Sequence, residues 1–351
     1  MTDTPNKTLI IRFSSVGDIV LSSLLVRTFR TRFPNCQLDY VVKEEFADLV
    51  RRNPNVSNVL LLPRGGSFGD LQQLRRTIRR NNYDLVVDIH DNLRSLVLSW
   101  GSQRVVRINK RKFARLMLVN CKVDLYRKLG GSPSVALRYL ETVSHCGVED
   151  DGRGLEIFYS DDDARRVEQL LESENVGDSR EFLGICPSAK HNTKMWPRER
   201  FAQAAAILSE EKNRAIILFG SQDEQARCEQ VRSEILATNP TARVVNLAGR
   251  ISLVETAAAM DRCALVLTND SGLMHIAAAR KRPLIAIFGS TVKQLGFFPF
   301  GTESRVVENV GLACRPCTHI GRSECPRGHF RCMLDVPVAE VVRAAQSLHT
   351  A

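Results

Sequence analysis

Three polar segments of the sequence carry side chains that could do chemistry. The first is Ser14-Ser15-Val16-Gly17-Asp18, which follows the apolar run Thr8–Phe13. Its glycine permits a tight turn, and Asp18 stands where a helix is expected to begin. A carboxylate in such a loop is free to take a proton from a hydroxyl group, because no core needs it. The spacing is equally compatible with a second role, in which Asp18 caps the helix.

The second segment is Ser188-Ala189-Lys190-His191-Asn192-Thr193-Lys194-Met195-Trp196-Pro197, directly after the apolar run Phe182–Pro187. Lysines in a loop of this kind can neutralise the charge of a departing phosphate, and this effect grows as water is excluded. The alternative is a solvated basic loop, which is the better interpretation for Lys190.

The third segment runs from Leu267 to His275 and contains Asn269-Asp270-Ser271-Gly272-Leu273-Met274-His275. A predicted strand leads there into small residues and then into a helix. Ser271 and Gly272 would expose backbone N–H groups at the start of that helix, which is a favourable place for a diphosphate. His275 lies on the first turn and can reach the same anion. The alternative is a capped helix with a packed histidine.

Two further polar groups also follow predicted strands. His90, Asn92, Arg94 and Ser95 follow the strand Asp84–Ile89, and Arg64 follows the strand Asn58–Pro63. A guanidinium binds carboxylates and phosphates bidentately, so Arg64 is either a site for such an anion or a solvated side chain.

Four of the ten cysteines gather near the C-terminus. Their spacing is Cys314-x2-Cys317-x7-Cys325-x6-Cys332, with only one short C-x-x-C pair. A structural zinc site is one interpretation, and reduced or partly paired thiols are the other. We do not assign these residues to catalysis.

The elements that position these segments form an α/β pattern. Short β-branched runs alternate with amphipathic stretches, which is typical of parallel sheets covered by helices. The pattern pauses around Gly147–Gly154 and then restarts. The sequence therefore predicts two doubly wound domains, residues 1–155 and 156–335, and a C-terminal helix in 336–351 that packs back on the N-terminal domain or stays with its own.

All three polar segments follow predicted strands. In open α/β sheets, ligands bind beyond the carboxyl ends of the strands, so these loops are the expected sites. The first loop lacks G-x-G-x-x-G and Walker A spacing, which disfavours dinucleotide-dependent dehydrogenases and P-loop enzymes.

Composition and charge set further limits. The chain has 351 residues, 44% hydrophobic and 25% charged, which is ordinary for a globular protein of two domains. No stretch approaches the roughly 20 apolar residues of a membrane-spanning helix, and no signal peptide is recognisable, so a cytoplasmic location is expected. The net charge of +10 favours polyanionic partners.

Three ordered motifs resemble glycosyltransferase family 9, the ADP-heptose lipopolysaccharide heptosyltransferases, and in particular its heptosyltransferase II-like members. They are Arg12–Val20, Lys194-Met195-Trp196-Pro197 and Asn269–His275. The resemblance spans nearly the whole chain. It implies a GT-B fold, in which two Rossmann-like domains face each other across a cleft. The N-terminal domain would bind the acceptor, and the C-terminal domain would bind the nucleotide sugar.

The resemblance also implies roles for individual residues. Asp18 matches the proposed general base, and Lys194 matches the lysine that faces the donor phosphates. The remaining donor-side matches are Ser188, Glu224 near the ribose, Ile251 near the adenine, Asp270, Ser271, Gly272, Leu273 and His275. On the acceptor side the candidates are Ser15, Arg64, His90, Asn92 and Arg94.

The activity implied is an inverting transfer of heptose from ADP-L-glycero-D-manno-heptose to the lipopolysaccharide inner core, with no metal required. The acceptor would be an anionic, lipid-linked sugar, so the enzyme would dock peripherally at the cytoplasmic face of the inner membrane. Two alternatives are a transferase or epimerase that uses a UDP-sugar and a basic nucleic-acid-binding protein. The spread of Lys and Arg over both halves, without an aromatic recognition motif, disfavours the second.

Overall fold

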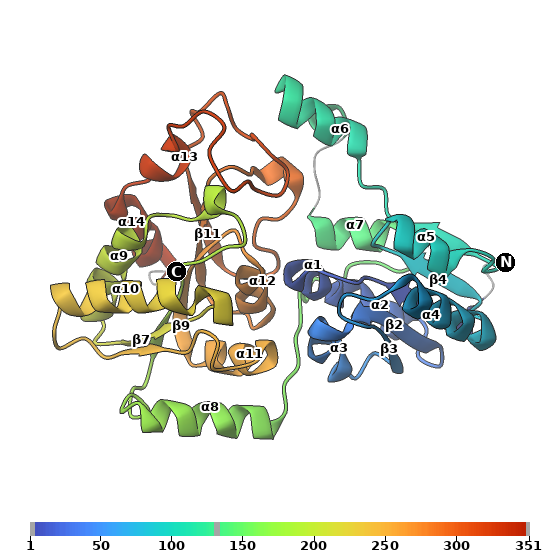
Figure 1. The fold of residues 1–351 in the computed structure, drawn as a ribbon, viewed down its shortest axis with the longest axis horizontal. Coiled ribbons are helices and arrows are strands. Elements are labelled where there is room, and N and C mark those ends of the chain that lie inside the picture. Colours follow the sequence, from blue (N-terminus) through green and yellow to red (C-terminus); the bar gives the residue numbers. More distant parts are fainter. Residues whose placement is uncertain (1–3, 130–133, 349–351) are drawn as a thin grey trace. The chain divides into compact units, whose positions relative to one another are not determined.

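The computed structural model describes residues 4–129 and 134–348, which form two compact units (Figure 1). The first contains residues 4–110 and 134–158, and the second contains residues 111–129 and 159–348. Each is built on its own parallel sheet, as the sequence predicted. The chain passes between the units after Phe158, three residues beyond the predicted boundary. The segment 111–129 was expected in the N-terminal domain, but its contacts place it with the second unit.

The sheet of the first unit has five parallel strands in the order β3-β2-β1-β4-β5. The strands are β1 (Lys7–Ile11), β2 (Gln37–Lys43), β3 (Asn58–Leu62), β4 (Leu85–Asp88) and β5 (Val105–Arg107). Central strands β1 and β4 are almost wholly buried, because helices cover both faces of the sheet.

Helices of the first unit lie on both faces of this sheet. They are α1 (Val16–Leu21), α2 (Ser23–Arg32), α3 (Asp48–Arg51), α4 (Phe68–Asn81), α5 (Leu93–Ser99) and α7 (Val135–Glu141). The sequence predicts a helix over Asp70–Asn82 with Leu71, Leu74 and Ile78 on one face. In the structure these three side chains pack in one cluster with Leu9 and Ile11 of β1, which confirms that face. Burial of these side chains fixes α4 and α5 on the sheet.

One predicted helix is divided in the structure. The sequence predicted a single helix over Ile19–Phe33, but α1 ends at Leu21 and α2 begins at Ser23. The hydroxyl of Ser22 donates to the carbonyl oxygen of Ile19 at 2.7 Å and lies 2.8 Å from the Tyr40 hydroxyl. Local hydrogen bonds of this kind compete with the regular helical pattern, and they separate the short α1 from α2.

The sheet of the second unit has six parallel strands in the order β11-β10-β9-β6-β7-β8. The strands are β6 (Phe182–Cys186), β7 (Ala215–Leu218), β8 (Val244–Asn246), β9 (Cys263–Asn269), β10 (Leu284–Phe288) and β11 (Ser304–Glu308). The β-branched runs 182–187, 215–220, 243–248, 264–268 and 284–289 predict the first five of these strands within two residues at each end. Strand β11, at the sheet edge and only partly buried, was not predicted.

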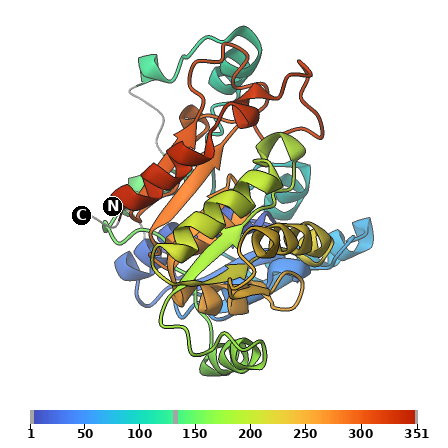
Figure 2. The ribbon, with the colours of Figure 1, turned by 90° about the vertical axis from the view of Figure 1, so that its left-hand side faces the viewer.

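Helices again cover both faces. They are α6 (Lys112–Leu116), α8 (Asp161–Ser173), α9 (Arg198–Glu210), α10 (Gln225–Thr238), α11 (Leu253–Asp261), α12 (Gly272–Ala279), α13 (Arg331–Leu334) and α14 (Val338–Leu348). Figure 2 shows α14, α9 and α10 side by side over one face of the second sheet. The core beneath them includes Trp196, Phe201 and the apolar stripe Val341, Ala345 and Leu348 of α14. The sequence left open whether this helix packs on the N-terminal domain, and in the structure its apolar face is occupied by α9, β10 and β11.

Across residues 4–129 and 134–348, no helix combines the length and apolar character needed to cross a membrane.

Candidate active site

Both sheets reverse their strand order at one point, and the predicted site loops follow the strands on either side of it. In the first sheet the reversal lies between β1 and β4, and in the second between β6 and β9. Such a reversal leaves a crevice beyond the carboxyl ends of the two strands, where α/β proteins bind ligands. Asp18 follows β1, His90 follows β4, Lys194 follows β6 and Asp270 follows β9. The three polar segments singled out from the sequence therefore lie at these positions.

Asp18 has cationic and hydroxyl partners at the start of α1. One carboxylate oxygen, Oδ1, lies 2.7 Å from an Arg12 guanidinium nitrogen and accepts a hydrogen bond from the Tyr139 hydroxyl at 3.0 Å. The other, Oδ2, accepts from the backbone N–H and the hydroxyl of Ser15 at 3.3 and 2.9 Å. The Arg12 and Asp18 side chains are only 10% and 17% exposed, so water screens this ion pair weakly.

Helix capping, the alternative role for Asp18, accounts for half of these contacts. Asp70 and Asp163 stand at the same third position of α4 and α8, and each accepts from the N–H and hydroxyl of a serine three residues earlier. Asp18 makes the same contacts with Ser15. It differs in its partners Arg12 and Tyr139, which capping does not require, so Asp18 is both a cap and a charged group of the crevice.

The protonation state of Asp18 follows from these contacts. Burial raises the pKa of the carboxyl, but the Arg12 charge and the hydrogen bonds from Ser15 and Tyr139 outweigh it and hold the pKa below its ordinary value. Asp18 is therefore ionised at neutral pH, the state in which a carboxylate can accept a proton. Arg12 is itself fixed by donating to the carbonyl oxygen of Ile89 at 2.7 Å, at the end of β4.

His90 lies beside this group, on the loop after β4. Its ring packs against Phe13 with a centroid distance of 4.7 Å, and its buried Nδ1 has no hydrogen-bond partner among the described residues. Burial and the neighbouring charges of Arg12 and Lys110 lower the pKa of His90 to about 3. His90 is therefore a neutral ring with one unused nitrogen, suited to a hydrogen bond with a neutral ligand group.

A buried aspartate that the sequence analysis did not single out shapes the same loop. Asp88 accepts hydrogen bonds from the backbone N–H groups of His90 and Asp91 and from the Ser95 hydroxyl. Asn92 caps α5 by accepting from the Ser95 N–H at 2.9 Å. Asn92 and Ser95 therefore hold the loop in place, whereas the Arg94 side chain is exposed.

Among the acceptor-side candidates, Arg64 follows the strand that is farthest along the sheet from this crevice. It follows the edge strand β3, its side chain is 84% exposed, and its nearest acid is Glu45, with Nε 3.6 Å from a carboxylate oxygen. A surface pair at this distance contributes little, so the Arg64 charge is available to a ligand.

Lys194 and Asp270 form the corresponding pair in the second unit. Lys194 Nζ lies 2.7 Å from Asp270 Oδ2, and these side chains are 14% and 5% exposed. The same oxygen accepts from the Thr291 hydroxyl at 2.6 Å. Lys194 was expected to face donor phosphates and Asp270 to contact the donor. The structure joins them in one ion pair, so a phosphate would share the lysine with this carboxylate.

The Lys194 loop is anchored by the tryptophan that follows it. Trp196 is fully buried, its Nε1 donates to the carbonyl oxygen of Val336 at 3.1 Å, and its backbone N–H donates to Asn269 Oδ1 at 3.0 Å. The second of these bonds ties the loop after β6 to the end of β9. A Cβ atom at Gly289 would lie 2.9 Å from the Thr193 carbonyl oxygen, so the close approach of the β10 loop requires glycine there.

The start of α12 has the predicted form. Ser271 is the extended residue before the helix, and Gly272 is its first residue. The first N–H groups of any helix have no partner within the helix, so they are free to meet an anion. Leu273 is half-buried on this turn. His275 is 3% exposed and near the Phe297 ring, so the histidine is largely packed, as the alternative interpretation held.

The remaining donor-side candidates follow strands β6, β7 and β8 in order across the sheet. Ser188 is buried, and its hydroxyl has no partner among the described residues. Glu224 accepts from the Ser221 N–H at 2.8 Å and so caps a short turn after β7. Ile251 is half-buried and stands two residues before α11. Their order places them progressively farther from Lys194 along the carboxyl edge of the sheet.

Sequence reasoning missed the loop that braces the Lys194 segment. Arg315 donates to the carbonyl oxygens of Gly289 and Thr291, at 2.5 and 2.8 Å, and Thr193 exchanges hydrogen bonds with the backbone of Arg322. No local pattern marks these contacts, because they join segments more than 20 and 120 residues apart.

All four C-terminal cysteines are free thiols; Cys314, Cys317 and Cys325 lie in this bracing loop, and Cys332 is buried in α13. Burial and the neighbouring Cys314 and Cys325 raise the pKa of Cys317, so these three lie in one region. Within the described ranges, no three His, Cys, Asp or Glu side chains are arranged to hold a metal ion.

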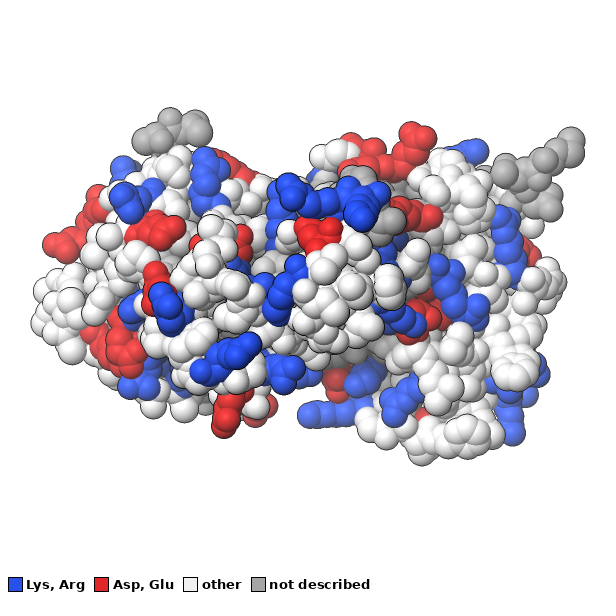
Figure 3. Space-filling view, turned by 90° about the horizontal axis from the view of Figure 1, so that it is seen from above, with Lys and Arg blue, Asp and Glu red and all other residues white. Residues whose placement is uncertain are grey.

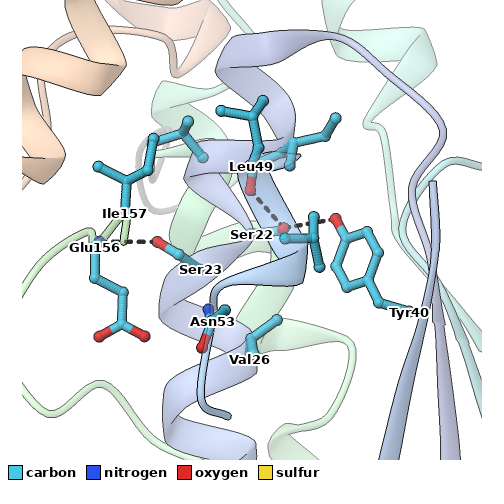
Figure 4. Close-up of a pocket in the computed structure, with 11 residues that line it drawn as sticks. Ser22, Ser23, Val26, Tyr40, Leu49, Asn53, Glu156 and Ile157 are labelled. Carbon is cyan, nitrogen blue, oxygen red and sulfur yellow. Dashed lines mark hydrogen bonds between the residues drawn. The ribbon is translucent and has the colours of Figure 1, made fainter. Parts of the chain in front are cut away.

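A small cavity lies behind α1, lined by side chains of α1–α3, β2 and the segment that leads out of the first unit (Figure 4). Its polar groups already have partners, since Ser22 bonds with Tyr40 and Ser23 accepts from the Glu156 N–H. None of the predicted site residues is among those that line it, so we do not place a substrate there.

Comparison with known proteins gives consistent similarities. The model of glycosyltransferase family 9 (heptosyltransferase) matches residues 71–326. Lipooligosaccharide heptosyltransferase 2 of Haemophilus influenzae is 32% identical over 297 residues, which cover 82% of this chain and 84% of that protein.

Two solved structures share the fold over almost the full length. A family 9 glycosyl transferase from Veillonella parvula has a TM-score of 0.79 and 19% identity, covering 98% of this chain and 97% of its own. The ADP-heptose LPS heptosyltransferase II of E. coli has a TM-score of 0.71 and 24% identity, covering 97% and 98%. These likenesses confirm the predicted GT-B fold class.

Proposed function

The chain belongs to glycosyltransferase family 9 and is a glycosyltransferase, and on that premise we propose that it transfers heptose from ADP-heptose to the inner core of lipopolysaccharide. The observation that carries this proposal is the set of groups beyond β6 and β9, where Ser188, Lys194 and the start of α12 offer hydroxyl, ammonium and backbone N–H donors. The similar Haemophilus protein is named a heptosyltransferase 2, which supports heptose as the sugar.

The donor would bind on the second unit. Its diphosphate would accept hydrogen bonds from the α12 N-terminus and from the Ser188 hydroxyl, which has no partner among the described residues. Glu224 would lie at the ribose and Ile251 at the adenine, because these residues follow the next strands across the sheet. Asp270 would hold Lys194 in place until the phosphate arrives.

The reaction would be a single displacement. An acceptor hydroxyl oxygen attacks the anomeric carbon while the bond from that carbon to the ADP oxygen breaks, so the configuration inverts. Asp18 takes the hydroxyl proton, and ADP leaves with the electron pair of the broken bond. The substrate hydroxyl would have to replace one of the present contacts to Asp18. The hydrogen bond from the neutral Tyr139 hydroxyl is weaker than the ion pair with Arg12, so it would be replaced before that ion pair.

Charge on the departing ADP would be stabilised by the protein itself. Negative charge grows on the phosphate oxygens as the bond breaks, and Lys194 and the α12 N-terminus would offer an ammonium and backbone N–H donors to that charge. We therefore propose that the transfer needs no metal ion.

The acceptor would be an anionic Kdo- or heptose-bearing lipid A. His90, with its unused Nδ1, and Ser15 would contact its neutral hydroxyl groups, and the exposed Arg64 and Arg94 its carboxylates or phosphates. A lipid-linked acceptor and a net charge of +10 are consistent with an enzyme that works at the cytoplasmic face of the inner membrane.

The test is product analysis. The purified protein should convert ADP-heptose and a heptose-deficient core acceptor to ADP and an acceptor one heptose heavier by mass spectrometry, in the presence of EDTA. A UDP-sugar donor is the control. Faster consumption of a UDP-sugar, or ADP-heptose turnover that requires Mg²⁺, would contradict the proposal, and tight binding of single-stranded DNA would favour the nucleic-acid alternative.

A further inference from the structure

An inserted segment, Arg111–Leu129, exposes apolar and basic side chains that the transfer chemistry does not use. It contains α6, a π-helical turn at Met117–Cys121 and a 3₁₀ turn at Arg127–Leu129. We propose that this segment is a docking surface for an anionic phospholipid bilayer. The proposal rests on the proposed function in one respect only, since a lipid-linked acceptor requires the enzyme to reach a membrane.

The inner face of the segment is fixed to the second unit. Ala114, Leu118 and Tyr126 are buried in one apolar cluster with Leu295, which follows β10. Lys122 Nζ also donates to the Pro316 carbonyl oxygen at 2.6 Å. Because packing and a hydrogen bond hold this face, the side chains on the outer face are presented from a defined surface.

The outer face carries large apolar side chains in solvent. Phe113 is 69% exposed, Leu116 is 54% exposed and Val123 is 42% exposed. Phe113 and Leu116 are three positions apart on α6, a spacing that places them on one side of the helix. Single exposed apolar residues are common, but a set within eleven residues marks an interaction surface.

The charges around these side chains are almost all positive. The segment contains six basic residues and one acidic residue, Asp124, which accepts a hydrogen bond from Gln294. The basic residues are Arg111, Lys112, Arg115, Lys122, Arg127 and Lys128. Figure 3 shows that many Lys and Arg side chains are exposed on the surface seen from above.

Aromatic and aliphatic groups among Lys and Arg match a bilayer surface in two ways. Phe and Leu gain free energy by entering the boundary of the acyl chains, and each cation near the surface is attracted to anionic headgroups. A second copy of this chain would bring the same six cations to the interface, so self-association through this face is opposed by like charges. The bilayer is therefore the occupant that satisfies both features.

Co-sedimentation of the full chain with vesicles tests the surface. The vesicles contain phosphatidylcholine alone or phosphatidylcholine with about 30 mol% phosphatidylglycerol, which supplies the anionic headgroups. Wild type should partition to the anionic vesicles. Phe113→Ser/Leu116→Ser should weaken this partitioning at least about 10-fold, and Lys112→Gln about 5-fold. The matched controls are Val310→Ser/Ile207→Ser, at positions 82% and 41% exposed, and Lys212→Gln, and they should bind like wild type.

The outcomes separate this inference from the proposed function. If Phe113→Ser/Leu116→Ser binds anionic vesicles as well as the control Val310→Ser/Ile207→Ser does, the docking surface is overturned. It is also overturned if the wild type is a dimer in solution and Phe113→Ser/Leu116→Ser alone makes it a monomer. Turnover with a de-acylated, water-soluble acceptor should be unchanged in Phe113→Ser/Leu116→Ser. If wild type binds anionic vesicles through this segment but does not use ADP-heptose, the surface stands and the proposed function fails.

Discussion

Asp18→Asn separates a general base from a helix cap. The amide keeps nearly the same shape and can still accept from Ser15, but it can neither take a proton nor balance the Arg12 charge. General bases contribute about 10²- to 10⁴-fold, so we expect turnover to fall at least ~10²-fold, or about 2.7 kcal/mol in the barrier. Binding of ADP should be close to wild type, because the donor residues belong to the second unit.

The same change should also destabilise the first unit. Loss of one partner from a buried ion pair costs about 3–5 kcal/mol, and the lower end applies because both side chains keep some exposure and Arg12 retains the Ile89 carbonyl. About 3 kcal/mol corresponds to a Tm decrease of roughly 10 °C for a unit of this size. Turnover must therefore be measured well below the lowered Tm, with the folded fraction followed by circular dichroism.

Two control variants make the result interpretable. Asp70→Asn makes the same change at the equivalent capping position of α4, where the described residues supply no arginine partner, so it should leave turnover unchanged and cost at most ~1 kcal/mol. Arg12→Met/Asp18→Asn removes both charges, so it should recover part of the lost stability while turnover stays low. The base assignment is refuted if Asp18→Asn keeps more than a tenth of the wild-type rate, or if the double variant regains turnover along with stability.

Three further predictions concern charge and pH. Lys194→Ala should weaken ADP-heptose binding and turnover together, whereas the control Lys190→Ala, at an exposed position of the same loop, should change neither. Unchanged steady-state kinetics in Lys194→Ala would show that Lys194 serves only as the ion-pair partner of Asp270. Tyr139→Phe removes a hydrogen bond to ionised Asp18, so the pKa of Asp18 rises and the acid limb of the kcat/KM profile moves to higher pH; an unmoved limb contradicts the assignment. Transferase activity should persist in EDTA. An immediate loss of activity that Mg²⁺ reverses would make Asp270 a candidate metal ligand. A slow loss of thermal stability in EDTA would instead point to a structural metal site at the four C-terminal cysteines.

The Asp18 pair also has a consequence for stability against pH. The folded-state pKa of Asp18 lies below its unfolded value, so the folded state binds fewer protons near that range. Its contribution to stability is complete above about pH 4 and is lost as the pH falls through the folded-state pKa. His90 stays neutral in the folded state near pH 6.5, so its titration adds no change in activity there. The unfolded chain does bind a proton at this histidine below about pH 6.5, so the stability that His90 contributes is complete above that pH and falls as the pH decreases toward the folded-state pKa of about 3.

Sequence patterns predicted most of the strands, because a strand buried on both faces is a short apolar, β-branched run in the local sequence, independent of which strands pair with it. They failed where burial is partial or the element is short. Strand β5 has three residues, and edge strand β11 is only partly buried, so neither gives a strong pattern. The division at Ser22 depends on the Tyr40 hydroxyl, which β2 supplies from outside the helix.

Motifs predicted which loops carry the site, but not the partners within it. Lys194 and Asp270 were chosen separately, and only the pairing of β6 with β9 brings their loops together. Tyr139 reaches Asp18 across 121 positions, and no local spacing encodes that contact. The same reason explains the segment 111–129, whose sequence position suggests the first unit while its buried side chains pack in the second.

Each proposed catalytic group is held by an opposite charge in this structure. Asp18 lies 2.7 Å from Arg12, and Lys194 lies 2.7 Å from Asp270, each at the crevice of its own sheet. Arg12 remains charged at any accessible pH, so its pairing keeps Asp18 ionised but also makes it a weaker base than a free carboxylate. Lys194 is the reverse case, because a phosphate can replace Asp270 as its partner while Thr291 still donates to the carboxylate left behind. In the proposed mechanism, donor binding would therefore exchange the partner of Lys194, and an acceptor hydroxyl would displace a neutral donor, Tyr139 or Ser15, from Asp18.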